Sequence, residues 1–362
     1  MKKILLLTGM LARAIYGYAG VRDSLDIKIG QMIMIGIGDR KSLAADDVLR
    51  EELRSGKIGG IVLFEKNIDA TAPAAQLTRL NNDCRALAAL PLWISIDEEG
   101  GKVHRLKEKY GFVAMPSAAA MGQADNTDST AWYYGRLAAE LKTLGFNLNY
   151  APDVDVAVNP DNTVIVQKGR SFSATPATVS KHALACIAAH KAAGVGNILK
   201  HFPGHGSSAG DSHLGIVDVS DTWKFRELLP FAEVIESGQC QAVMTAHIIN
   251  KHWDASLLPA TLSKKVVNGM LRGFLGFEGV VFSDDMQMGA INKNYGFSES
   301  IVLAVNAGVD VLMFANNVQP DQKPVTATEV HSLIRKLVRQ HKISRKRIDE
   351  AYRRIKALKA VM

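Results

Sequence analysis

Residues 195–213 read Val-Gly-Asn-Ile-Leu-Lys-His-Phe-Pro-Gly-His-Gly-Ser-Ser-Ala-Gly-Asp-Ser-His. The first five residues form an apolar run that is typical of a buried strand, and cationic, imidazole, carboxylate and glycine residues crowd the rest. Buried polar groups cost free energy unless they are paired, so such a segment suits a binding site better than a core. Glycine lets the backbone turn tightly beside a ligand. The stretch therefore indicates a strand whose C-terminal end opens into a functional loop.

The same unit, a short apolar strand followed by a helix, recurs along the chain. The predicted strands are 29–37, 58–64, 92–97, 146–156, 196–201, 242–249, 280–285 and 309–315. The predicted helices are 43–55, 73–88, 129–144, 177–193, 222–237, 262–271, 298–306 and 327–341, with a final basic helix over 344–361. Eight such units favour a closed (β/α)8 TIM barrel over a doubly wound open sheet. We expect one α/β domain over residues 20–362, since no linker interrupts the pattern.

Composition limits the classes of function. The chain has 362 residues, 47% of them hydrophobic and 22% charged, as in a globular enzyme. Its net charge of +7 is scattered, and no basic patch with interleaved aromatic residues indicates a nucleic-acid partner. We also expect no stable membrane span, because no uninterrupted apolar run reaches the length that a spanning helix needs.

The N-terminus resembles a secretory signal peptide over residues 1–19. Lys2 and Lys3 precede an apolar run, and small residues at 17–19 would suit cleavage before Gly20. Arg13 interrupts the apolar region. The pattern slightly favours an exported or periplasmic protein over a cytoplasmic one.

Polar residues end the predicted strands. Asp97 ends the third strand, Lys200 and His201 end the fifth, and Asp284 and Asp285 end the seventh. Sites in (β/α)8 barrels lie at the C-terminal ends of the strands, so we expect these groups to converge. Side chains alternate along a strand, so one of the two adjacent aspartates should face the barrel mouth while the other makes a structural hydrogen bond.

These residue types can perform nucleophilic catalysis with a general acid and base. Asp284 could attack an electrophilic carbon, while His213 donates and then removes a proton and Asp211 orients its ring. A zinc site built from His201, His205, His213 and an aspartate is an alternative. We expect neither a metal nor another cofactor, because Pro203 and Gly204 keep the first two histidines off a common helical face.

Five ordered motifs make the chain resemble family 3 glycoside hydrolases, and among them the single-domain bacterial β-N-acetylglucosaminidases. The motifs lie at 96–105, 169–173, 200–206, 211–213 and 282–286. The resemblance implies that Asp284 is the nucleophile of a retaining hydrolase and that His213, paired with Asp211, is its acid/base. It also implies a set of residues that contact the sugar hydroxyls: Asp97, Arg105, Arg170, Lys200 and His201. The implied substrate is a small carbohydrate with terminal β-N-acetylglucosamine, such as an oligosaccharide or a cell-wall muropeptide.

Alternatives remain within and outside this family. Some relatives of this type would transfer the sugar to phosphate, because an imidazole does not repel an anionic acceptor. Other members are β-glucosidases that take their acid/base from a second domain, which we do not expect here. A sugar-binding barrel without activity and a metal-dependent hydrolase barrel are the rivals from other classes.

Overall fold

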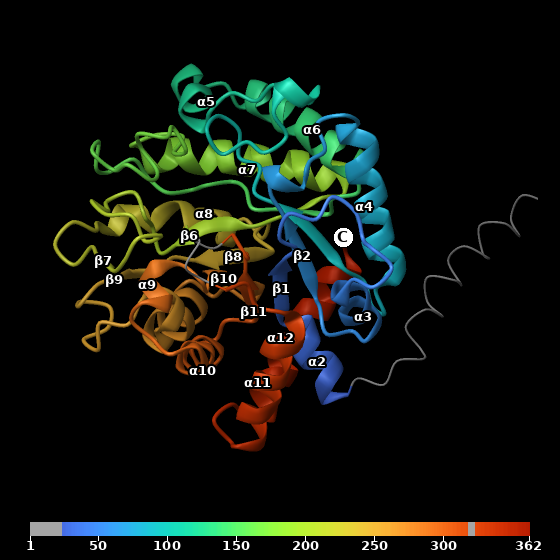
Figure 1. The fold of residues 1–362 in the computed structure, drawn as a ribbon. Coiled ribbons are helices and arrows are strands. Elements are labelled where there is room, and N and C mark those ends of the chain that lie inside the picture. The colour runs from blue at the N-terminus through green and yellow to red at the C-terminus, as the bar shows by residue number, and fades with distance from the viewer. Residues whose placement is uncertain (1–23, 318–322) are drawn as a thin grey trace, which may run out of the picture.

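A computed structural model describes residues 24–317 and 323–362 of the chain (Figure 1). The predicted signal peptide, residues 1–19, lies outside the described residues and stays a prediction. Within the described ranges, no helix combines the length and apolarity needed to cross a bilayer.

A parallel sheet closes into a barrel at the centre of the molecule. Around the sheet the strands are β5 (Gly196–Asn197), β4 (Leu148–Asn149), β3 (Trp93–Ile96), β2 (Gly60–Leu63), β1 (Ile33–Gly36), β11 (Val311–Phe314), β10 (Val280–Asp285), β8 (Ala242–Thr245) and β6 (Leu199–Phe202). The first and last of these, β5 and β6, are consecutive in the chain and are separated only by Ile198. A parallel bridge between Asp153 and Lys200 joins β6 to the chain beyond β4. The sheet therefore meets itself, and the predicted single-domain (β/α)8 barrel is confirmed.

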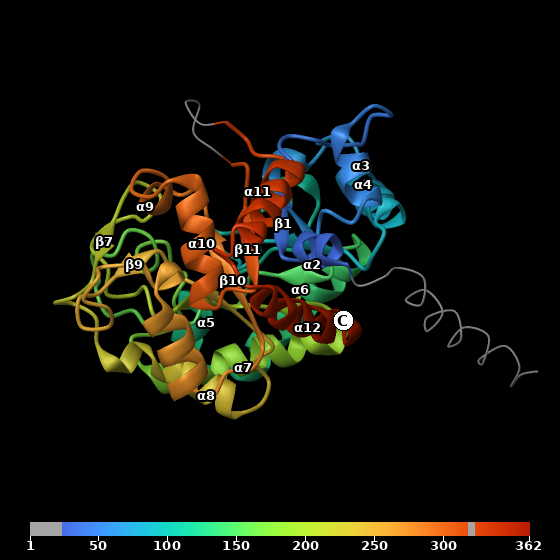
Figure 2. The same ribbon diagram turned by 90° about the horizontal axis from the view of Figure 1, so that it is seen from below.

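Helices surround the strands on the outside of the barrel, as Figure 2 shows. They are α2 (Leu25–Gln31), α3 (Val48–Arg54), α4 (Pro73–Leu87), α5 (Ala118–Ala124), α6 (Thr127–Thr143), α7 (Pro176–Ala193), α8 (Leu229–Glu236), α9 (Gly289–Asn292), α10 (Phe297–Ala307), α11 (Ala327–Arg339) and α12 (Arg345–Ala360). Short 3₁₀ turns are η1 (Glu65–Asn67), η2 (Glu108–Tyr110), η3 (Phe225–Glu227) and η4 (Ala260–Leu262), and η5 (Lys265–Phe274) is π-helical. The barrel strands are buried on both faces, because helices cover the outer face and side chains fill the barrel interior.

Several predicted strands were wrong in extent. The predicted strand 242–249, for example, ends at Thr245, and Ile248–Ile249 belongs to a second sheet. The predicted strand 29–37 begins in the helix α2, whose N-cap Ser24 accepts a hydrogen bond from the backbone N–H of Ile27 at 3.3 Å, and only β1 is extended. The predicted strand 146–156 is reduced to β4. Its ladder is interrupted at Pro152, which has no backbone N–H to donate, and resumes only as the isolated bridge between Asp153 and Lys200.

A small second sheet lies beside the barrel mouth. Its strands are β7 (Val217–Asp218) and β9 (Ile248–Ile249), which pair in parallel. Val217, Ile248 and two neighbouring apolar residues form a separate cluster, against which Trp223 and Trp253 pack. This cluster holds the chain that follows the loop after β6.

Candidate active site

A cavity of about 320 Å³ opens at the C-terminal ends of the barrel strands. Most of the predicted site residues line it: Asp97, Arg105, Arg170, Lys200, His201, His213 and Asp284. Asp211 lies behind His213 and is hydrogen-bonded to it. The structure thus brings together all eight residues that the sequence predicted for the site.

Asp284 and Asp285, at the end of β10, differ in their surroundings. Burial raises the pKa of Asp284, but the neighbouring His247, His201 and His213 outweigh it, and the net pKa lies below the ordinary value. Burial raises the pKa of Asp285 to about 6. The carboxylate of Asp285 accepts backbone N–H groups of Gln287 and Ala315, each at 3.0 Å. Asp284 is therefore the carboxylate with the lower pKa of the two, whereas Asp285 ties the loop after β10 to the end of β11.

His213 and Asp211 form a dyad on the loop after β6. The Nδ1 atom of His213 lies 2.6 Å from Oδ1 of Asp211, and the same oxygen accepts the His213 backbone N–H at 2.9 Å. A carboxylate can only accept, so Nδ1 is the donor and Nε2 is left to exchange a proton in the cavity. Burial raises the pKa of Asp211, but hydrogen bonds from His213 outweigh it and leave the net pKa lowered.

A network of ion pairs also lines the cavity. Asp97 bonds to Lys200 and accepts a hydrogen bond from Arg105 at 3.0 Å. The carboxylate of Glu99 accepts hydrogen bonds from Nε and Nη2 of Arg170, at 2.8 and 2.7 Å. It also contacts the Lys200 ammonium at 2.5 Å. Lys200 and Glu99 are almost fully buried, with side-chain exposures of 2% and 3%. Charge-assisted pairs of this kind hold their donors in fixed orientations, which suits recognition of a polyhydroxylated ring.

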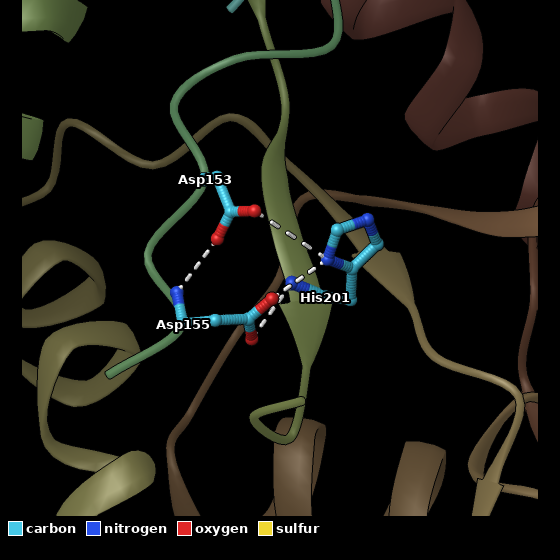
Figure 3. Close-up of side chains that lie close together, drawn as sticks. All are labelled: Asp153, Asp155 and His201. Atoms are coloured by element: carbon cyan, nitrogen blue, oxygen red, sulfur yellow. Dashed lines mark hydrogen bonds and ion pairs between the residues drawn. The ribbon is translucent and has the colours of Figure 1, made fainter. Parts of the chain in front are cut away.

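His201 is oriented by a carboxylate behind it, as Figure 3 shows. Its Nδ1 lies 2.8 Å from Oδ2 of Asp155, and the other oxygen of this carboxylate, Oδ1, accepts the backbone N–H of His205 at 2.7 Å. Oδ1 of Asp153 accepts the backbone N–H of Asp155 at 2.9 Å, and its Oδ2 lies 4.0 Å from Nδ1 of His201. Burial raises the pKa of Asp155, but His201 outweighs it and the net pKa falls to about 2.

The group Asp153, Asp155 and His201 has the residue types of a metal site, with ligand atoms within 4.8 Å of one another. Two features oppose a cation there. The Nδ1 atom of His201 donates to Asp155, so it offers no lone pair. The guanidinium of Arg170 also lies 3.4 Å from Oδ2 of Asp153 and already supplies a positive charge. The described contacts make the group an ion-pair network.

His205, which the zinc alternative required, points away from this chemistry. Its ring is hydrogen-bonded to Ser208 at 2.7 Å and to Ser212 at 3.3 Å. Burial lowers its pKa to about 4, so it is neutral near pH 7. His205 braces the loop after β6, and the three histidines do not form a common ligand set in the described part of the chain.

Sequence reasoning missed the acidic partners of the site. Glu99 and Asp155 were not predicted as site residues, although each holds a predicted one. A signal existed, because Asp97 and Glu99 are two positions apart and so face the same side of an extended chain. Asp153 and Asp155 have the same spacing.

The chain matches the family described as "Glycosyl hydrolase family 3 N terminal domain" over residues 24–358. The chain belongs to glycosyl hydrolase family 3. The resemblance inferred from the motifs is confirmed, and with it the prediction of a glycoside hydrolase.

Similar proteins are named as hexosaminidases. The chain is 36% identical to Beta-hexosaminidase A of Pseudoalteromonas piscicida over 73% of its length, and spans 47% of that protein. It is 37% identical to the Beta-hexosaminidase of Tolumonas auensis, covering 74% of this chain and 78% of that protein. A family 3 β-N-acetylglucosaminidase from a Paenibacillus species superposes with a TM-score of 0.83 at 35% identity, covering 93% of this chain and 63% of that one. The β-N-acetylhexosaminidase of Beutenbergia cavernae gives 0.79 at 28% identity, over 93% and 98% of the two chains.

Proposed function

We propose that this protein is a retaining β-N-acetylglucosaminidase that removes terminal, non-reducing N-acetylglucosamine. The observation on which this proposal depends is the arrangement of one cavity, which Asp284 and His213 line together while Asp211 holds His213 through a hydrogen bond. Relatives of the same family that are named β-hexosaminidase support the choice of sugar.

The reaction proceeds in two steps. The carboxylate of Asp284 attacks the anomeric carbon, the bond from this carbon to the glycosidic oxygen breaks, and the Nε2–H of His213 protonates the leaving oxygen. His213 then removes a proton from water, which attacks the same carbon and releases Asp284 as a carboxylate. Two displacements at one carbon retain its configuration. Asp211 stabilises the protonated, positively charged imidazole of His213.

The sugar is held by the ion-pair network of the cavity. The cations Arg105, Arg170 and Lys200 offer N–H donors to ring hydroxyl oxygens, and Asp97 offers an acceptor. Each of these groups already has a charged partner, so the sugar meets donors of fixed orientation. The natural substrates that we propose are cell-wall muropeptides or other N-acetylhexosamine glycans, on the strength of the family resemblance.

A panel of 4-nitrophenyl β-glycosides tests the assignment. We expect the highest kcat/KM on β-N-acetylglucosaminide and little activity on β-glucoside, with a β-configured sugar as the first product in a proton NMR time course. A higher rate on β-glucoside would refute the sugar assignment, and an inverted first product would refute the mechanism. Release of N-acetylglucosamine from muropeptides tests the cell-wall substrate separately.

Transfer of the sugar to phosphate is the second candidate. Lys102 and Lys168 line the same cavity as His213, and cations near the site would attract an anionic acceptor. The same panel, assayed with and without phosphate, distinguishes the two. A phosphorylase would yield N-acetylglucosamine 1-phosphate, whereas the hydrolase would be indifferent to phosphate.

A further inference from the structure

The segment that follows β10 is hydrogen-bonded to the loop that bears His213. The backbone N–H groups of Gly289 and Ala290 donate to the carbonyl oxygens of His213 and Ser212, each at 3.1 Å. The Lys293 ammonium donates to the carbonyl of Leu214 at 3.2 Å. Three successive carbonyls of the loop therefore accept hydrogen bonds from α9 and from the residue after it. Both views place α9 beside the end of that loop at β7 (Figures 1 and 2).

This contact matters because few others fix the imidazole, the nearest being the 3.3 Å hydrogen bond between His205 and Ser212. The side chain of His213 is 60% exposed, so packing does not determine its place. Its hydrogen bond to Asp211 joins two residues of the same loop and would move with that loop. The backbone contacts with α9 are different, because α9 follows directly from β10, which ends in Asp284 and Asp285. The acid/base loop is thus fixed to the same segment as the nucleophile.

Gly289 can form this contact only without a side chain. A Cβ atom at this position would lie 2.7 Å from the carbonyl oxygen of His213 and 2.8 Å from the carbonyl carbon and oxygen of Leu214. These are backbone atoms, which cannot rotate away as a flexible side chain would. The φ angle of Gly289 lies outside the left-handed region, so the steric contact, and not the backbone conformation, excludes a side chain.

We propose that Gly289 is a positioning residue for the acid/base His213. The inference rests on the proposed function, since it assigns proton transfer to His213. A methyl group at position 289 pushes the carbonyls of His213 and Leu214 away and carries the imidazole out of reach of the leaving oxygen. The nucleophile keeps its place at the end of β10, so attack continues without assistance from the acid.

The test compares Gly289→Ala with Gly215→Ala. Gly215 lies in the same loop, has nothing within 4 Å of an added Cβ and is also outside the left-handed region, so it is a matched control. The measurement is kcat/KM on aryl β-N-acetylglucosaminides of graded leaving-group pKa. General acid catalysis contributes about 10²–10⁴-fold where the leaving group is poor. We expect Gly289→Ala to lose at least about 30-fold on the poorest leaving group and less than about 3-fold on dinitrophenolate.

Two further readouts separate positioning from general damage. Azide should raise kcat of Gly289→Ala on the dinitrophenyl substrate, because it replaces the water that His213 no longer activates. The limb of the pH profile that reports proton donation should also flatten. Lys293→Met removes one donor without adding bulk, so it provides a second variant should Gly289→Ala fold poorly. It should change the leaving-group dependence in the same direction, by about 3–10-fold.

Hydrogen exchange tests, independently of activity, whether Gly289 holds the loop that bears His213. In Gly289→Ala, peptides covering 211–216 and 288–294 should exchange faster than in the wild type, and in Gly215→Ala they should not. Unchanged exchange, or an equal loss of kcat/KM on all leaving groups, overturns the positioning role. A wild type that is inactive on every β-N-acetylglucosaminide would instead overturn the proposed function, and the exchange data would still decide whether Gly289 holds the loop.

Discussion

Replacing Glu99 by glutamine should weaken the fold and the sugar site together. Glu99 is the carboxylate between the Arg170 guanidinium and the Lys200 ammonium, and its side chain is 3% exposed. Glutamine keeps the shape but removes the charge, leaving two buried cations with Asp97 beside Lys200 and with Asp153 at 3.4 Å from Arg170. Removing one partner of a buried ion pair costs about 3–5 kcal/mol. Because Asp97 still bonds to Lys200, we expect the lower end, about 3 kcal/mol.

The assay is thermal unfolding across pH, with Glu233→Gln, an exposed position on α8, as control. A loss of about 3 kcal/mol corresponds to a fall in Tm of roughly 5 °C for a chain of this size. Burial raises the pKa of Glu99, but Arg170 and Lys200 outweigh it, so the folded pKa lies well below the ordinary 4.5. A lowered pKa gives stability that is complete above about pH 5 and is lost on acidification below pH 4.5. The wild type should therefore lose Tm more steeply than Glu99→Gln over that range.

The sugar site should respond as well. Arg170 and Lys200 lose the carboxylate that orients them, so kcat/KM should fall at least about tenfold, mainly through KM. The control should change Tm by no more than about 1 °C. A Glu99→Gln protein with the Tm and the acid profile of the wild type would refute the reasoning, because the network would then contribute nothing measurable.

Three further predictions concern the catalytic groups and the substrate. His213→Ala should lose about 10²–10⁴-fold on natural disaccharides but little on activated aryl glycosides, and azide should yield a β-glycosyl azide; equal losses would reduce His213 to a structural role. Asp285→Asn should keep activity within about tenfold, because its amide oxygen still accepts the two backbone N–H groups. Burial raises the pKa of Asp285 from 3.8 to about 6, so the wild type loses stability as pH rises through that interval. The Tm of Asp285→Asn relative to the wild type should therefore increase over the same interval, and a Tm difference that stays constant with pH would contradict this. A β-N-acetylgalactosaminide, with one hydroxyl inverted, should react about 10–200-fold more slowly, and equal rates would show that this hydroxyl is not contacted.

The strand ends were predictable because their chemistry is local. A strand buried on both faces is a continuous apolar run, so the polar residue that ends it is visible in the sequence, as Asp97 and Asp284 were. The same reasoning failed at the start of the first predicted strand. The predicted strand 29–37 began too early, since residues 29–31 end the helix α2, and Ser24 as its capping residue was the available signal.

Contacts between residues distant in the sequence could not be predicted from the sequence pattern. Glu99 pairs with Arg170, which lies 71 residues away, and no periodicity links the two positions. The contact of Gly289 with the His213 loop likewise depends on how two loops meet above the barrel. Such pairings arise from tertiary packing, and they fix the orientations on which the proposed chemistry depends.

Covalent trapping tests the central assignment most directly. A 5-fluoro-N-acetylglucosaminyl fluoride forms the glycosyl-enzyme quickly and releases it slowly, so intact mass should rise by one sugar and peptide mapping should place the label on Asp284. Asp284→Ala should take up no label and should lose several orders of magnitude in turnover while keeping its Tm. A label on Asp285 or on any other residue, or an enzyme inhibited without a covalent adduct, would contradict the account.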